Sequence, residues 1–139
     1  MFKRIMMPVD LAHVDSLAQA MTVAADLAGH YGVELVFVGV TGTAPSGAAR
    51  SPEEYRDKLA GFAAEKASRH AISTASHTVV SHDPAVELDD VLVRAVAEVG
   101  ADLVVMATHV PNMSDMILPA HGGALARHTD VSVFLVRHA

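Results

Sequence analysis

Several residue types that mark common protein classes are absent from this chain of 139 residues or scarce in it. There is no cysteine, which excludes disulfides and thiolate chemistry. There is no tryptophan, and aromatic residues make up only 4% of the chain. No apolar run approaches the roughly 18 residues of a membrane span, so we expect no membrane insertion. Acidic residues outnumber lysine and arginine by 16 to 10, and the net charge of −6 argues against a nucleic-acid partner.

What is present is a chain that is half apolar, mainly alanine, valine, leucine and methionine. Its length fits one domain, 1–139, with a real core. The first residues run directly into a strand pattern rather than a signal-peptide layout, so we expect a cytoplasmic protein.

Short apolar runs alternate with longer helical patterns, which predicts an α/β fold with a parallel sheet. Most of the runs are nearly continuous in apolar residues, as expected of strands covered on both faces. The strand signal of the third run, at 78–80, is weaker. We expect strands at 3–9, 34–40, 78–80, 102–107 and 131–136.

Capping signals place the helices between these strands. Ser51-Pro-Glu-Glu54 is a capping box with proline at the first helical position, and Asp83-Pro84 is a second start signal. Glycines at 32 and 100 are stop signals. We expect helices at about 17–28, 51–70, 84–99 and 116–127, and a loop over the carboxyl edge of the sheet at 41–50.

The segment 107–128 is the most informative part of the chain. A strand, then a loop of polar and turn-forming residues, then a helix start is how an α/β fold presents backbone N–H groups to a phosphate. Yet the early part of this loop has no glycine, where a phosphate would approach most closely. The sequence therefore raises the question of whether an inherited nucleotide site still works.

An ordered set of short motifs resembles the universal stress protein family over nearly the whole chain. The resemblance implies a doubly wound α/β fold of the adenine-nucleotide α-hydrolase-like type, with a five-stranded parallel sheet in the order 3-2-1-4-5. It also implies homodimers through the last strand and, in one branch, ATP bound without a catalytic apparatus, so we expect no catalytic residue. The motifs are Phe2-Lys-Arg-Ile-Met-Met-Pro-Val-Asp10, Ala28-Gly-His-Tyr-Gly-Val-Glu-Leu35, Asp83-Pro84, Gly100-Ala-Asp-Leu-Val-Val-Met106, and Arg127-His128 followed by Val131-Ser-Val-Phe-Leu-Val136.

Carrying the family's site over residue by residue gives two unequal halves. Pro8-Val9-Asp10 matches the family's Pro-Val-Asp, whose aspartate lies near the ribose, and Val40 matches the position whose backbone reads adenine. The family's first glycine pair falls on Ala107 and Val110, and its later Gly-Ser pair falls on Pro119-Ala120. The departures are therefore concentrated in the half that contacts phosphate.

These departures have physical consequences. Val110 is β-branched and precedes Pro111, so its backbone is pushed toward an extended conformation. Pro111 and Pro119 have no N–H to donate. Polar residues of the loop, Ser114 among them, would replace the lost donors only in part. The candidate nucleotide-binding residues are Pro8, Val9, Asp10, Val40, Met106, Ala107, Thr108, His109, Asn112, Pro119, Ala120 and His121.

Other interpretations of the same residues stay open. Asp10 suits a ribose ligand and equally a cap of the first helix. Nine histidines are many for this length, and His13, His82, His109 and His121 all follow strands or begin helices. They show no metal-ligand spacing, whereas protonated His109 or His121 is suited to a phosphate. A Ser-His-Asp catalytic triad could be composed from Ser114, His109 and Asp10. We do not expect one, because no nucleophile elbow surrounds the serine.

Three functions are compatible with the sequence. The first is a regulatory module of the stress response that binds ATP or a related adenine nucleotide. The second is a homodimeric module, paired through the apolar strand at 131–136, that has lost ATP and signals through an unidentified protein partner. The third, a weak nucleotide hydrolase, is disfavoured because no P-loop is present.

Overall fold

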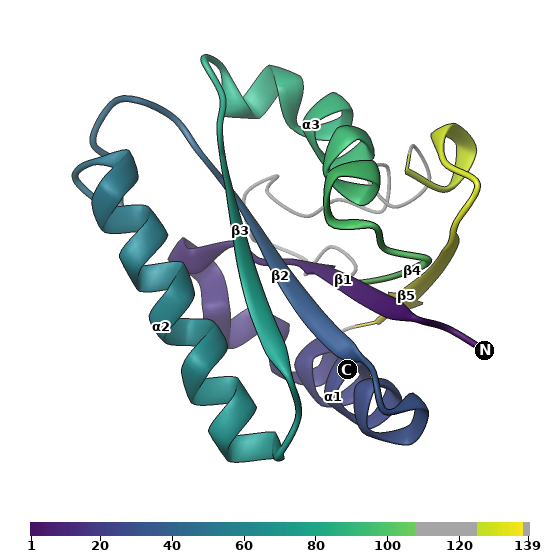
Figure 1. Ribbon diagram of the computed structural model, residues 1–139. Coiled ribbons are helices and arrows are strands. Elements are labelled where there is room, and N and C mark those ends of the chain that lie inside the picture. Colours follow the sequence, from purple (N-terminus) through teal and green to yellow (C-terminus); the bar gives the residue numbers. More distant parts are fainter. Residues whose placement is uncertain (108–124, 138–139) are drawn as a thin grey trace.

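Five parallel strands form a single sheet in the computed structural model, which describes residues 1–107 and 125–137 (Figure 1). The sheet order is β3-β2-β1-β4-β5, and every neighbouring pair is parallel. The topology implied by the family resemblance is therefore confirmed. The strands are β1 (Arg4–Pro8), β2 (Glu34–Thr41), β3 (Thr74–Val80), β4 (Leu103–Ala107) and β5 (Ser132–Val136).

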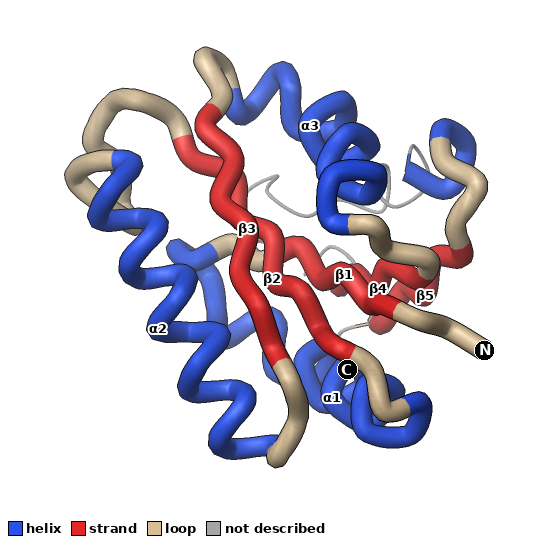
Figure 2. The backbone as a smooth tube through the Cα atoms, viewed as in Figure 1, coloured by secondary structure: helices blue, strands red, loops and turns tan. Residues whose placement is uncertain are grey.

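Helices follow the first three strands (Figure 2). A short 3-10 segment with non-helical backbone at His13 precedes the first α-helix. Residues 125–128 are helical, and the rest of the helix expected at 116–127 lies outside the described residues. The elements are η1 (Leu11–Leu17), α1 (Ala18–Tyr31), α2 (Pro52–His70) and α3 (Pro84–Val99).

Alternating side chains of the strands divide the core into two layers. On β2, Leu35 and Phe37 pack in the cluster of α1 and α2, while Val36 packs in the cluster of α3. β1 and β4 alternate in the same way. Figure 1 accordingly shows α1 and α2 on one side of the sheet and α3 on the other. Strands covered on both faces explain the nearly continuous apolar runs.

The two glycine stop signals and the first start signal act as the sequence predicts. Gly32 and Gly100 follow α1 and α3 with left-handed backbones, at φ 64° and 72°. The Ser51 hydroxyl accepts a hydrogen bond from the N–H of Glu54 at 3.1 Å, which caps α2.

The two edge strands differ from what the sequence predicts. β3 begins at Thr74 and pairs with β2 over seven positions, although only 78–80 carries an apolar signal. An edge strand whose two faces are only partly covered by helices needs no continuous apolar run. On β5, Phe134 is 45% exposed and Leu135 43% exposed, so the expectation that this strand is covered on both faces is wrong for the described chain.

Within the described ranges, no helix is both long and apolar enough to cross a membrane.

Candidate functional site

The carboxyl ends of β1 and β4 separate, whereas those of β1 and β2 stay paired. The register of β1 with β2 continues to the pair Pro8 and Val38, whereas that of β1 with β4 stops at Met6 and Val104. The chain leaves β1 toward α1 on one face and β4 follows α3 on the other. Such a switch point is where open α/β sheets bind ligands, so the fold predicts a pocket at the ends of β1 and β4. The pocket described next differs from this expectation, because it lies on the β2 side of β1 and no β4 residue lines it.

A pocket of about 260 Å³ lies at the carboxyl ends of β1 and β2, and we call it the carboxyl-edge pocket. It brings together Asp10 and Val40, two of the residues expected to bind nucleotide. Its remaining walls come from the loop after β2 and from the first turns of α2 and α3. Its lining residues are Asp10, Ala12, Val40, Thr41, Gly42, Ser46, Gly47, Ala48, Tyr55 and Pro84.

The Asp10 carboxylate is held by two contacts. One oxygen accepts from the backbone N–H of Ala12 at 3.0 Å, which caps η1. The other lies 2.8 Å from Nδ1 of His13. The capping role weighed from the sequence is therefore present. A carboxylate has about four acceptor positions, so capacity remains for a ligand that enters the pocket.

Hydrogen bonds hold the loop between β2 and α2 in place beside the pocket. Ser46 N–H donates to the carbonyl of Ala49 at 2.8 Å, and the Ser46 hydroxyl accepts from Ala48 N–H at 3.2 Å. Lys58 donates to the Ala48 carbonyl at 2.7 Å and also pairs with Glu54 at 3.2 Å. The hydrogen bond with Lys58 is the main cause that lowers the pKa of the Glu54 carboxyl. The loop therefore lies at the carboxyl edge of the sheet, as expected.

Tyr55 is a pocket residue that the sequence analysis does not single out. It lies in the first turn of α2, and its side chain is only 3% exposed. It fits because β2 carries a glycine opposite it: a Cβ atom at Gly39 would lie 2.5 Å from the Tyr55 hydroxyl oxygen. A glycine inside a strand pattern signals a close approach, so Gly39 was the available clue.

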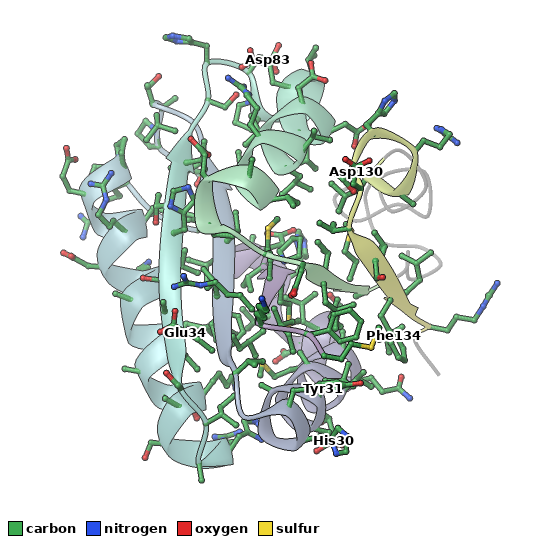
Figure 3. The ribbon with its side chains drawn as sticks, turned by 45° about the vertical axis from the view of Figure 1, so that its right-hand side comes forward. His30, Tyr31, Glu34, Asp83, Asp130 and Phe134 are labelled. Atoms are coloured by element: carbon green, nitrogen blue, oxygen red, sulfur yellow. The ribbon has the colours of Figure 1, made fainter. Side chains whose placement is uncertain are left out.

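The start of α3 forms the far wall of the pocket, and its cap differs from the expected one. Asp83 occupies the N-cap position without a side-chain cap bond, and Figure 3 shows it at this end of the helix. Instead, Glu87 accepts from Asp83 N–H at 3.1 Å and from the Ser81 hydroxyl. These two hydrogen bonds, with Ser81's the larger, lower the pKa of the Glu87 carboxyl.

The other expected site residues divide into two groups. Pro8, Val9, Met106 and Ala107 are buried at the ends of β1 and β4 and do not line the carboxyl-edge pocket, so any contact they make would be through backbone or shape. The residues of the phosphate half lie outside the described residues, and they are Thr108, His109, Asn112, Pro119, Ala120 and His121.

Two of the four histidines considered as a group, His13 and His82, fall in the described part. His13 contacts Asp10, and His82 lies between β3 and α3. Residues 1–107 and 125–137 contain no group of three or more histidine, aspartate or glutamate side chains that could hold a metal ion.

Comparison with known proteins agrees with this architecture. The model of the universal stress protein family matches residues 1–137, whereas no curated protein matches. A protein of this family from Burkholderia pseudomallei is 22% identical, with a TM-score of 0.70 over 99% of this chain and 96% of that one. A universal stress protein in complex with cAMP is 18% identical, with a TM-score of 0.69 and 99% of both chains covered. The universal stress protein from Archaeoglobus fulgidus in complex with dAMP is 18% identical, with a TM-score of 0.67 and 96% of both chains covered. The chain thus belongs to the universal stress protein family.

Proposed function

We propose that this protein is a regulatory module, without enzymatic activity, that binds an adenine nucleotide with its nucleoside moiety in the carboxyl-edge pocket. The observation that carries the proposal is that one pocket joins Asp10, the position matched to ribose, with Val40, the position matched to adenine. Relatives of the same fold carry cAMP and dAMP, which supports an adenine nucleotide as the ligand class.

We further propose that the phosphates beyond the first contribute little. The chain has Val110-Pro111 and Pro119-Ala120 where the family's phosphate loop has glycines and serine. Proline supplies no N–H, and a β-branched residue before proline favours extended backbone. The nucleoside half of the site is intact in sequence and the phosphate half is not, so ATP is expected to bind about as tightly as AMP.

Calorimetric titration of the full chain with AMP and with ATP tests both statements. We expect measurable binding of both nucleotides, with dissociation constants within a factor of about ten, or ~1.4 kcal/mol. No binding of either nucleotide would refute the nucleotide-binding function. ATP binding more than tenfold tighter than AMP would refute the weak phosphate half while leaving the nucleoside site in place.

The apolar outer strand favours a second role, a homodimeric interaction module. β5 is last in the sheet order, so its outer backbone edge pairs with no strand of the described chain. Phe134 and Leu135 are exposed on opposite faces of this strand, and Figure 3 shows Phe134 at this edge. An exposed apolar edge strand tends to pair with another strand. We propose that β5 pairs with β5 of a second copy across a two-fold axis.

Light scattering of a charged edge variant tests the dimer. Phe134→Lys with Leu135→Glu is expected to lower the dimer fraction of a folded protein. Val133 is a poorer choice because it packs against the α3 cluster. Val80→Lys, at an exposed apolar position on the opposite edge strand β3, is the matched control and should leave the dimer intact. A wild-type protein that is monomeric at micromolar concentration would contradict the proposal.

A further inference from the structure

One turn of the loop between β2 and α2 supplies three of the residues that line the carboxyl-edge pocket, Ser46, Gly47 and Ala48. The loop leaves the carboxyl end of β2 and returns to the start of α2 (Figure 1). Ser46 N–H donates to the Ala49 carbonyl at 2.8 Å, and the Ser46 hydroxyl accepts from the N–H groups of Ala48 and Ala49 at 3.2 and 3.4 Å. These bonds give the turn its shape, but they do not fix its place beside the pocket.

The Lys58 side chain joins this turn to α2. Its ammonium donates a hydrogen bond to the Ala48 carbonyl at 2.7 Å. Long side chains in a helix point toward its N-terminus, which explains how a residue of the second turn of α2 reaches the loop. Ala49, the next residue of the turn, is buried in the core cluster of α1 and α2. The core therefore holds one end of the turn, and Lys58 holds the carbonyl beside the pocket.

The Glu54 carboxylate directs the Lys58 ammonium toward the loop. One of its oxygens lies 3.2 Å from Nζ of Lys58, four residues later on the same helix, where side chains are neighbours. The other oxygen lies 3.5 Å from Nε of Arg50, the residue that follows the turn. An ammonium has three donor hydrogens, so one bond to Glu54 and one to Ala48 leave the third open to water at this half-exposed side chain.

A pocket wall that is ordered before the ligand enters gives tighter binding, because the free energy of ordering a loose loop would oppose association. Lys58 itself lies outside the lining of the pocket, so its effect on a ligand passes through the backbone of the turn. We propose that Lys58 is a positioning residue of the nucleotide site, whose bond to the Ala48 carbonyl holds the pocket wall in place and raises the affinity for the nucleoside moiety. This inference rests on the proposed nucleotide-binding function.

Calorimetric titration of lysine variants with AMP and with adenosine, which lacks the phosphate, tests the proposal. Lys58→Met keeps an apolar stem and removes the ammonium, whereas Lys58→Arg keeps a charged donor. Lys66→Met is the matched control, because Lys66 lies on the same helix but pairs with Glu65 at 3.2 Å and lies over the Phe62 ring. We expect Lys58→Met to bind both ligands about three- to tenfold more weakly than the wild type. Lys58→Arg should recover most of this loss, and Lys66→Met should bind both ligands as the wild type does.

Amide hydrogen exchange of the ligand-free proteins reports the order of the wall directly. The N–H groups of Ser46, Ala48 and Ala49 are hydrogen-bonded within the turn, so they exchange faster when the turn opens more often. We expect faster exchange at these three amides in Lys58→Met, and wild-type exchange in Lys58→Arg and Lys66→Met. Weaker nucleotide binding by Lys58→Met without faster exchange in the turn would overturn the proposal.

The other failures are distinguishable. A Lys58→Met variant that loses affinity for AMP but not for adenosine overturns the proposal, because Lys58 would then act on the phosphate through its charge. So does a Lys58→Met variant that binds both ligands as the wild type does, or a Lys58→Arg variant that loses as much affinity as Lys58→Met. In each of these cases the wild type still binds AMP and the proposed function stands. Wild-type protein that binds neither ligand refutes the proposed function and this inference together. A thermal melt of each variant checks that the fold is retained.

Discussion

The two ends of β2 each carry a hollow, and the two hollows differ in size and in the helix ends that surround them. The one at the amino end, which we call the amino-edge hollow, measures about 390 Å³, whereas the carboxyl-edge pocket measures about 260 Å³. The smaller one has the Asp10 carboxylate and the Tyr55 hydroxyl in its wall. The larger one is lined by Ala28, Gly29, Gly32, Val33, Glu34, Ala71, Ile72 and Ser73.

The direction of the chain explains the difference. Parallel strands joined by helices place helix starts at the carboxyl edge and helix ends at the amino edge. The first turns of α2 and α3 therefore meet the carboxyl-edge pocket, while α1 and α2 end beside the amino-edge hollow. Helix N-termini present free N–H groups and a partial positive charge. Volume alone would favour the amino edge, whereas the helix starts favour the carboxyl edge.

Closing the carboxyl-edge pocket should have the largest effect. Gly39→Ala places a methyl group where the Tyr55 hydroxyl lies, so we expect AMP affinity to fall more than tenfold and stability to fall by about 1–3 kcal/mol. Calorimetry and urea unfolding measure the two effects. The matched control is Gly29→Ala at the amino-edge hollow, where the nearest atom would lie 4.0 Å away. An equal loss of AMP affinity in both variants would abolish the distinction between the two ends.

Neutralising the acceptor in the pocket should have the next largest effect. Asp10→Asn keeps the shape of the side chain but removes its charge, and we expect AMP to bind about tenfold more weakly, or ~1.4 kcal/mol. Glu34→Gln removes a carboxylate from the wall of the amino-edge hollow and is expected to leave AMP affinity unchanged. Calorimetric titration of the two variants side by side measures the difference. Unchanged binding by Asp10→Asn would remove Asp10 from the site.

The buried phenol should make the protein less stable in alkali. The pKa of Tyr55 is raised above its unfolded value of about 10, so its contribution is complete below pH ~10 and is lost as pH rises toward the folded-state pKa. The loss is at most about 1.4 kcal/mol per pH unit. Urea unfolding at neutral and alkaline pH should show a shallower loss for Tyr55→Phe than for the wild type or Tyr31→Phe. Identical slopes in all three proteins would mean that the phenol is not buried.

A substitution at the amino edge should change stability only slightly and should leave AMP affinity unchanged. Ala71 ends α2 with φ 54°, a left-handed conformation that glycine adopts without strain. Ala71→Gly is expected to raise the free energy of unfolding by about 0.5–1 kcal/mol and to leave AMP affinity unchanged. Urea unfolding and calorimetry check the two halves of this expectation. A weaker affinity for AMP in this variant would connect the amino edge to binding.

The α/β class could be predicted from apolar runs and helix caps, and the strand order from the family resemblance. The errors have physical causes. The first part of β3, Thr74–His77, is polar because an edge strand needs less apolar cover, so its sequence carries little strand signal. The 3-10 segment after Asp10 was missed because His13 interrupts any helical period. The apolar run at 131–136 predicts that Phe134 and Leu135 are buried, although they are exposed on the described chain.

The candidate site was predictable only where it lies on the strands. Asp10 lies two residues beyond β1 and Val40 lies in the last part of β2, so placing the strands places these residues together. Tyr55 comes from the first turn of a helix after a loop of ten residues, and its reach into the pocket depends on tertiary packing. Gly39 carried the one local signal, but a glycine in a strand does not say which side chain approaches it.

The most direct test of the central claim is to map AMP binding onto the two ends of β2. Backbone amide NMR spectra of the isotope-labelled protein, recorded during titration with AMP, report both ends at once. We expect shifts of the amide signals at Asp10–Ala12, at Val40–Ala48 and at Tyr55, and unchanged signals at Ala28–Glu34 and Ala71–Ser73. Shifts confined to the amino-edge hollow, or no shifts at either end at saturating AMP, would contradict the central claim.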